Sequence, residues 1–237
     1  MVAVGKRAIV SLALREEAQR LAEVTTPVMK SYAEKIGADF ELIVTEKVRA
    51  GHAKFEKYQL FDLLAQYQRI CYLDCDILVM PESPDIFGAV DHERFGAFFD
   101  SEVKDNDADI PAWREEEIAF FQQVKGDIGW RNSYFNSGVM VMERRHQNLF
   151  DYRKELSPGK RCVDQTQINY DFQRLGIKGQ NIGPRFNYLL ALSRSPRQMR
   201  ERFDGNYFLH YAGFATFYPE RSLYEKVIED RRFVYGF

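Results

Sequence analysis

Strand-like and helix-like runs alternate along the first third of the chain. Continuous or alternating apolar positions predict strands, and apolar positions three or four residues apart predict amphipathic helices. Two strand–helix–strand units in succession are typical of a doubly wound, mostly parallel α/β sheet with helices on both faces. The pattern predicts strands at Arg7–Leu14, Phe40–Thr45 and Arg69–Met80, and helices at Glu16–Ile36 and Phe55–Tyr67.

The second half of the chain is less regular. Its strand-like runs are Phe95–Phe99 and Gly138–Met142, and its helix-like runs are Glu115–Val124, Gln165–Arg174 and Pro219–Asp230. Pro219 suits the first turn of the last helix, where a missing N–H is tolerated. No repeat, low-complexity tract or Gly/Ser linker divides the sequence. We therefore expect a single α/β domain over residues 1–237.

Composition narrows the classes of protein that this chain can be. Of its 237 residues 45% are hydrophobic and 29% are charged, so the chain can bury a core and is not disordered. The 33 Lys and Arg against 35 Asp and Glu give a net charge of -2, which argues against nucleic-acid binding. Three cysteines do not form a disulfide framework.

The sequence offers no membrane or export signal. No apolar run approaches the roughly 20 residues that span a bilayer, so we expect no transmembrane segment. The segment Met1–Lys6 leads directly into a strand and lacks the apolar stretch of a signal peptide. We therefore expect a cytoplasmic protein.

Two carboxylates interrupt the most apolar strand. Asp74 and Asp76 lie in the run YLDCDILV, and isolated buried carboxylates require partners or a metal. On one strand, residues two apart point to the same side, so both could ligate one ion. Hard oxygen ligands suit Mg²⁺ or Mn²⁺. The alternative is that Asp74 ends the strand and Asp76 caps a turn; the apolar context favours the metal site.

Four motifs in order resemble those of a known family. The Asp-x-Asp strand resembles that of nucleotide-sugar glycosyltransferases with the GT-A fold, and the chain more narrowly resembles glycosyltransferase family 8. The further matches, which extend the resemblance to about Gly213, are Phe135–Val139 (FNSGV), Asp164-Gln165 followed by Asn169, and His210–Gly213 (HYAG).

The resemblance implies a reaction and its cofactor. It implies transfer of a hexose from a nucleotide-diphosphate sugar, UDP-glucose or UDP-galactose, to a hydroxyl of a saccharide or protein-glycan acceptor. Asp74, Asp76 and His210 would hold Mn²⁺ or Mg²⁺. The resemblance also implies retention of the anomeric configuration. No residue stands out as a covalent nucleophile, which suits a front-side mechanism assisted by the donor phosphate.

Further site residues follow from the resemblance. Residues 1–100 would form the nucleotide-binding half and residues 101–237 the acceptor and sugar half. Asp164 and Gln165 would lie near the reacting carbon, although an Asp at a helix N-terminus is also favoured simply as a cap. The nucleotide and phosphates would contact Leu12, Ala13, Lys57, Asp74 and Cys75, and the donor sugar would contact Asp100, Asn136, Ser137 and Gly138.

Lys57 has a neighbour that could take its place. Lys54 lies one helical turn before it, and an exposed helix face is the alternative interpretation for both lysines.

The chain also departs from the family pattern. The Lys-Pro-Trp expected after Gly213 is replaced by Thr216, Phe217 and Tyr218. The missing lysine could be substituted by Arg194, Arg197 or Arg200. The segment Leu12–Arg15 lacks the usual base-contacting residues.

Two other functions remain open from the sequence. A sugar-phosphate nucleotidylyltransferase would share the sheet and the metal carboxylates, but it usually carries a Gly-rich N-terminal loop, and Ser11–Arg20 contains no glycine. A non-catalytic binding domain could also have kept the GT-A fold. Loss of turnover in a folded Asp76→Ala variant would separate an enzyme from such a domain.

Overall fold

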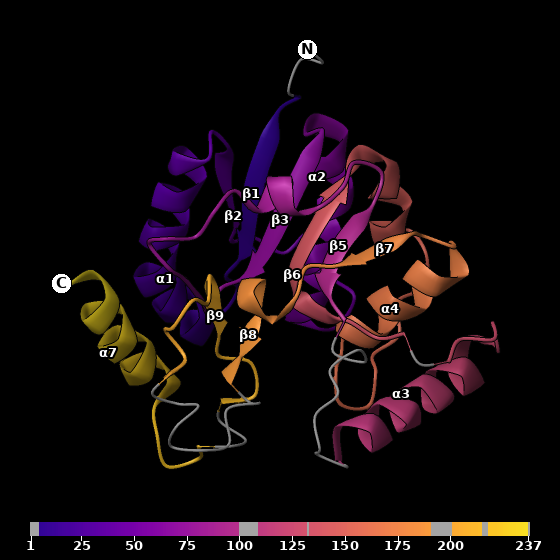
Figure 1. Ribbon diagram of the computed structural model, residues 1–237. Helices are drawn as coiled ribbons and strands as arrows, with labels where there is room; N and C mark the ends of the chain where they lie inside the picture. The colour runs from indigo at the N-terminus through magenta and orange to yellow at the C-terminus, as the bar shows by residue number, and fades with distance from the viewer. Residues whose placement is uncertain (1–4, 100–108, 132, 191–200, 215–217, 237) are drawn as a thin grey trace.

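The computed structural model describes residues 5–99, 109–131, 133–190, 201–214 and 218–236. A six-stranded central sheet in the order β2-β1-β3-β6-β5-β7 forms its centre (Figure 1). β6 runs antiparallel to both its neighbours, and the other pairs are parallel. The strands are β1 (Arg7–Leu12), β2 (Asp39–Ile43), β3 (Arg69–Asp74), β5 (Phe95–Phe98), β6 (Asn136–Glu143) and β7 (Gly179–Asn181).

Helices cover both faces of this sheet. In β3, Cys71 and Leu73 pack into the core beneath α1, while Ile70 and Tyr72 pack into the core beneath α2 and α4. This alternation confirms the doubly wound α/β prediction, since a strand buried on both faces must be apolar throughout. One face carries α1 (Glu16–Lys35) and α7 (Leu223–Tyr235), and the other carries α2 (Leu60–Gln66), the 3₁₀ helix η4 (Arg144–Phe150) and α4 (Gln165–Arg174).

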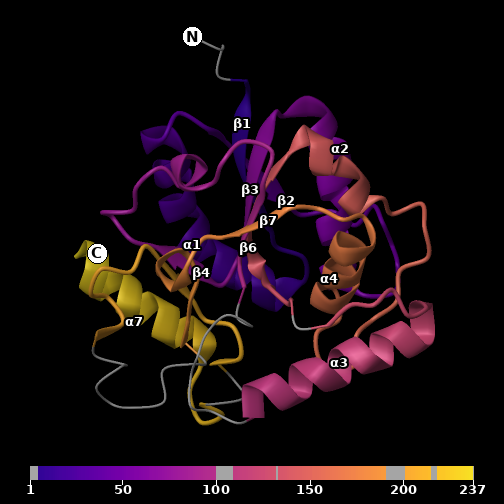
Figure 2. The same ribbon diagram turned by 45° about the vertical axis from the view of Figure 1, so that its right-hand side comes forward.

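The helix α3 (Asp109–Lys125) packs against α4 (Figure 2). An aromatic cluster lies between them: the Trp130 and Tyr134 rings are stacked with centroids 5.9 Å apart, and Trp113 meets Tyr134 edge-on at 5.8 Å.

The predicted strand Arg69–Met80 is in fact two strands, so that prediction was wrong. β3 ends at Asp74, a turn follows, and β4 (Ile77–Val79) joins a second sheet with β9 (Phe208–His210) and β8 (Tyr188–Leu189). The Thr25 hydroxyl donates to the carbonyl of Cys75 at 2.8 Å and holds the turn. Asp74 and Asp76 therefore do not share a face of one strand, and another arrangement must bring them together.

Other boundaries also differ from the predictions. The helix predicted at Phe55–Tyr67 starts as the 3₁₀ helix η1 (Ala53–Gln59) before α2, and α3 begins earlier than the predicted Glu115. The last helix begins at Leu223, because the Ser222 hydroxyl accepts a hydrogen bond from the Glu225 backbone N–H at 3.3 Å and caps it. Pro219 thus lies outside the helix. The described residues also include the 3₁₀ helices η2 (Ile86–Ala89) and η5 (Pro184–Phe186).

None of the helices in the described ranges is both long and apolar enough to cross a lipid bilayer.

Candidate active site

The candidate site lies at the carboxyl ends of β1 and β3. β2 and β3 lie on opposite sides of β1, so the order in which the chain adds strands to the sheet reverses at β1. Ligands of open α/β sheets bind at such a point. Leu12, the last residue of β1, is the register partner of Asp74, the last residue of β3. The predicted nucleotide residues Leu12 and Ala13 therefore stand beside the predicted metal ligands.

Asp74, Asp76 and His210 converge from three segments. Asp74 ends β3, Asp76 lies in the following turn, and His210 ends β9, which pairs with β4. One ligand atom from each residue lies within 4.8 Å of the others. His210 Nε2 is 3.3 Å from Asp76 Oδ1 and 3.7 Å from Asp74 Oδ2. The two aspartates occupy the strand end and the turn, as the alternative interpretation had it, yet their carboxylates meet at the imidazole.

Electrostatics favour the ionised form of Asp76. Burial raises the pKa of its carboxyl, but the attraction of a protonated His210 and of Lys57 outweighs burial, so in this state the pKa of Asp76 lies below its usual value. An ionised carboxylate is the form that a divalent cation requires as a ligand.

Two neighbours set the orientation of His210. Its Nδ1 lies 2.8 Å from Asn187 Oδ1, and an amide oxygen can only accept, so Nδ1 carries the proton. In the neutral ring, Nε2 then keeps its lone pair and faces the two aspartates. Gly138 allows this approach, because a Cβ at that position would lie 2.1 Å from His210 Cε1.

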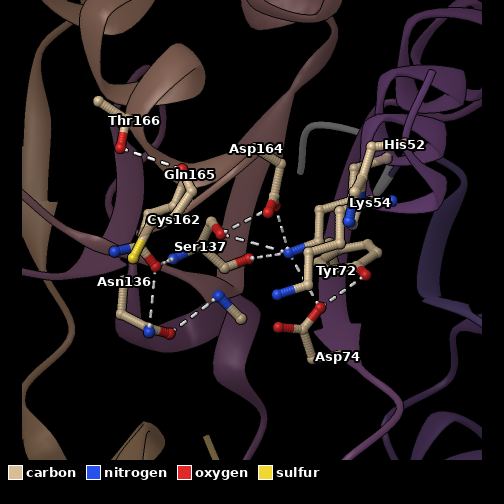
Figure 3. Close-up of polar contacts among 12 residues, drawn as sticks. His52, Lys54, Tyr72, Asp74, Asn136, Ser137, Cys162, Asp164, Gln165 and Thr166 are labelled. Atoms are coloured by element: carbon tan, nitrogen blue, oxygen red, sulfur yellow. Dashed lines mark hydrogen bonds and ion pairs between the residues drawn. The ribbon is translucent and has the colours of Figure 1, made fainter. Parts of the chain in front are cut away.

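Lys57 joins the Asp74–Asp76–His210 cluster, called the metal cluster below, to the predicted catalytic residues. Figure 3 shows three of its partners, Asp74, Ser137 and Asp164, close together. Its side chain is buried, and Nζ lies 3.0 Å from Asp74 Oδ1 and 2.8 Å from Asp164 Oδ2. It also donates to the Ser137 hydroxyl at 3.2 Å. Burial lowers the pKa of Lys57, but Asp164 and Asp74 outweigh burial and raise it above the usual value. The exposed-face interpretation is therefore wrong for Lys57 and correct for Lys54, which is exposed.

Asp164 and Gln165 both point into the site. Asp164 occupies the N-cap position of α4, as the helix-cap alternative has it, but its side chain makes no capping hydrogen bond and turns to Lys57 and Ser137 instead. Gln165 Oε1 accepts from the Ser137 backbone N–H at 3.0 Å and from Asn136 Nδ2 at 3.2 Å. The start of α4 fixes where Asp164 lies, and the ion pair with Lys57 accounts for the direction in which its side chain points.

A hydrogen-bonded chain connects these residues with the metal cluster. Asn136 Oδ1 accepts from the Gly138 N–H at 2.9 Å and from Asn187 Nδ2 at 3.0 Å, and Asn187 in turn holds His210. Asn136, Ser137 and Gly138, predicted from the FNSG segment, thus lie between Gln165 and His210.

Two residues of this site, Asn187 and Tyr72, were not predicted from the sequence. Asn187 is fully buried. The one sequence feature that could have indicated it is a polar amide among the mostly apolar residues RFNYLL. Tyr72 donates to Asp74 Oδ1 at 2.8 Å, but inside an apolar strand it looked like a core residue.

The remaining predicted residues divide into two groups. Cys75 lies between Asp74 and Asp76 in the sequence, but its thiol packs against the core and burial raises the pKa of that thiol. Asp100, Arg194, Arg197, Arg200, Thr216 and Phe217 lie outside the described residues.

The sequence profile described as "Glycosyl transferase family 8" matches residues 12–216. The chain belongs to glycosyltransferase family 8. The protein is accordingly a glycosyltransferase, and neither the nucleotidylyltransferase nor the non-catalytic alternative is retained. All the site residues predicted above fall inside the matched span. No curated protein sequence matches the chain significantly.

Solved structures of glycosyltransferases share the fold. A glycosyltransferase involved in glycosylation of the major capsid of PBCV-1 has 15% identity and a TM-score of 0.60, over 97% of this chain and 100% of that one. The galactosyltransferase LgtC, solved with donor and acceptor sugar analogues, has 18% identity and a TM-score of 0.53 over 96% of both chains. GlyE of Streptococcus pneumoniae has 16% identity and a TM-score of 0.54, over 95% of this chain and 60% of GlyE. These likenesses confirm the predicted GT-A fold.

Proposed function

We propose that this family 8 enzyme is a metal-dependent hexosyltransferase that uses UDP-glucose or UDP-galactose and transfers the sugar, with retention, to a hydroxyl of a saccharide or protein-glycan. The convergence of Asp74, Asp76 and His210 beside the Lys57–Asp164 pair carries this proposal. The donor and acceptor sugar analogues bound by the related fold of LgtC support the substrate class.

The three side chains suit a divalent cation, with Mn²⁺ preferred to Mg²⁺. Two carboxylate oxygens and one imidazole nitrogen form a mixed donor set, and an imidazole nitrogen favours a transition metal over Mg²⁺. The neighbours fit as well: Tyr72 and Lys57 occupy Asp74 Oδ1, which leaves Oδ2 on the side of His210. A bound cation would supply positive charge to the donor diphosphate and to the leaving group.

We assign the chain's own residues to binding and orientation. Leu12, Ala13 and the backbone of Cys75 would line the nucleotide in the half formed by residues 1–100. Asn136, Ser137, Gly138 and Asp100 would contact the donor sugar, and Asp164 and Gln165 would face its reacting carbon. Lys57 would hold Asp74 and Asp164 at a fixed distance from each other, so that the metal ligands and the residues around the donor sugar keep their spacing.

The contacts of Asp164 agree with a reaction that retains the anomeric configuration without a covalent intermediate on this residue. Its Oδ2 already contacts Lys57 and the Ser137 hydroxyl, which reduces its nucleophilicity. We therefore propose a front-side reaction. The bond between the anomeric carbon and the phosphate oxygen breaks, the acceptor oxygen bonds to the same face of that carbon, and the acceptor proton passes to the phosphate.

Donor hydrolysis tests the proposal without a known acceptor. UDP release from UDP-glucose and from UDP-galactose would be measured with Mn²⁺ and with EDTA, for the wild type and for Asp76→Asn. We expect turnover of one donor, which falls at least 100-fold with EDTA or in Asp76→Asn. Asp91→Asn, a change at an exposed aspartate, is the matched control and should leave turnover intact. Equal UDP release with and without EDTA would refute metal dependence.

A further inference from the structure

Glu117 on α3 is a buried carboxylate outside the cluster described above. Its exposed fraction is 1%. Both of its oxygens accept short hydrogen bonds, Oε1 from the Arg161 backbone N–H and Oε2 from the Thr166 hydroxyl, each at 2.6 Å. Within the described part of the chain, no lysine or arginine forms an ion pair with it. Burying a carboxylate is costly, so the structure retains Glu117 against a substantial desolvation penalty.

The two residues that donate hydrogen bonds to Glu117 lie on either side of the predicted catalytic residues in the sequence. Arg161 precedes Asp164 along the chain, and Thr166 directly follows Gln165. Glu117 therefore holds both ends of the short segment 161–166. This segment is where the chain enters α4, and α4 carries Asp164 at its N-cap.

The surroundings of Glu117 are built for this contact. Tyr134 lies 3.0 Å from the Thr166 hydroxyl and can donate to it, which leaves the Thr166 proton for Glu117. Gly159 passes so close that a Cβ there would lie 2.5 Å from Glu117 Oε2. Two independent features, a hydrogen-bond relay and a backbone that only glycine can supply, thus fix the carboxylate of Glu117 against the segment.

We propose that Glu117 is a positioning residue for the transfer reaction, acting through segment 161–166 on Asp164 and Gln165. This inference rests on the proposed function. Asp164 meets Lys57 at 2.8 Å, and Gln165 meets the Ser137 backbone N–H at 3.0 Å. Both contacts depend on where α4 begins, and small displacements of groups near a reacting centre reduce rates strongly. Helix α3 thereby supports the catalytic residues from outside the site.

The test compares Glu117→Ala with Glu117→Gln in Mn²⁺-dependent hydrolysis of UDP-glucose and UDP-galactose. We expect Glu117→Ala to lower kcat at least tenfold and to change the KM for the donor by less than threefold, because other residues bind the nucleotide. Glu117→Gln should retain most of kcat. The amide oxygen of the new glutamine can accept from the Arg161 backbone N–H, and its amide nitrogen can donate to the Thr166 hydroxyl. That hydroxyl can then donate to the Cys162 carbonyl, which lies 3.0 Å away in the wild type.

Two further variants keep the test informative if Glu117→Ala does not fold. Thr166→Val removes the hydroxyl at nearly constant volume and should lower kcat at least threefold with little change in KM. Glu116→Gln is the matched control, because Glu116 is the exposed neighbour, 3.6 Å from the Arg161 guanidinium, and its change should leave kcat intact. All rates are compared per folded protein, well below each variant's melting temperature.

The outcomes separate this inference from the proposed function. If Asp164→Asn and Gln165→Ala lose turnover while Glu117→Ala and Thr166→Val keep the wild-type kcat, the positioning role is refuted and the site stands. Glu117→Gln as impaired as Glu117→Ala would also refute it, because the hydrogen bonds would not be what matters. If Asp164→Asn and Gln165→Ala retain full turnover, the catalytic assignment itself fails, and the role of Glu117 fails with it.

Discussion

At the scale of single residues, the site depends on two buried side chains that link its parts. Lys57 is a cation held between Asp74 and Asp164, and Asn187 is a neutral amide held between Asn136 and His210. Lys57 holds the two carboxylates in place by its positive charge, and Asn187 keeps the proton of the His210 ring on Nδ1. Their removal should therefore have different consequences.

Replacing Lys57 by methionine should destabilise the fold. The change leaves two carboxylates without their shared cation, and breaking a buried ion pair typically costs about 3–5 kcal/mol. Urea unfolding would measure the loss, and the double variant Lys57→Met with Asp164→Asn should recover part of it. Lys54→Met is the matched control, since Lys54 is exposed and its change should shift stability by less than about 0.5 kcal/mol. Unchanged stability in Lys57→Met would contradict the buried charge network.

Replacing Asn187 by alanine should weaken metal binding more than it weakens the fold. His210 would lose the acceptor that keeps its proton on Nδ1, and loss of such an outer partner typically lowers metal affinity about 10–100-fold. Titration calorimetry with Mn²⁺ would measure this. Asn206→Ala offers a matched control, because the Asn206 amide donates to the Arg202 backbone carbonyl at 2.9 Å rather than to a residue that holds His210. Wild-type Mn²⁺ affinity in Asn187→Ala would remove Asn187 from the site.

At the scale of elements, the sequence predicted strands and helices better than it predicted their breaks. Between Arg69 and Met80 only Asp74 and Asp76 interrupt the apolar run, and periodicity does not show whether they mark a turn or two ligands on one strand. That turn depends on distant contacts: the Thr25 hydroxyl on α1 and the Tyr211 N–H, which donates to the Asp76 carbonyl at 3.0 Å. Contacts between residues far apart in sequence leave no local pattern. Gln165–Arg174 was predicted correctly because its helical spacing is local.

The start of η4 provides a pH-dependent test at this scale. His146 is buried and its Nδ1 accepts from the Glu143 backbone N–H at 3.0 Å, and burial lowers its pKa from 6.5 to about 4. A neutral buried histidine stabilises the fold above the unfolded pKa, and this contribution is lost as the pH falls from about 6.5 toward 4. It amounts to about 3 kcal/mol.

His146→Asn should make stability less sensitive to acid. The asparagine oxygen can accept from Glu143 but cannot titrate. Unfolding free energies at pH 7 and pH 4.5 would be compared for both proteins, so that carboxylates common to both cancel. We expect a larger loss in the wild type, and an equal loss in the two proteins would show that His146 does not stay neutral in the fold.

At the scale of the whole molecule, order along the chain proved more informative than any single motif. Asp-x-Asp, FNSG, Asp-Gln and His-x-x-Gly are individually short, but together they led to the GT-A fold and to family 8, which the profile match over residues 12–216 bears out. They also identified Asp74, Asp76 and His210, which the fold brings together from strands of two sheets and from the turn between β3 and β4. Asn187 and Glu117 belong to no such motif, since each acts by supporting a neighbour in space.

The central claim is that the Asp74–Asp76–His210 cluster binds a metal together with a uridine nucleotide. Thermal unfolding with UDP, GDP, CMP and dTDP, each with and without Mn²⁺, tests it directly, because a ligand that binds only the folded state raises the Tm. We expect UDP to raise the Tm only when Mn²⁺ is present, and Asp76→Ala to abolish this shift. The same UDP shift without Mn²⁺ or in Asp76→Ala, or no shift with any nucleotide, would contradict it.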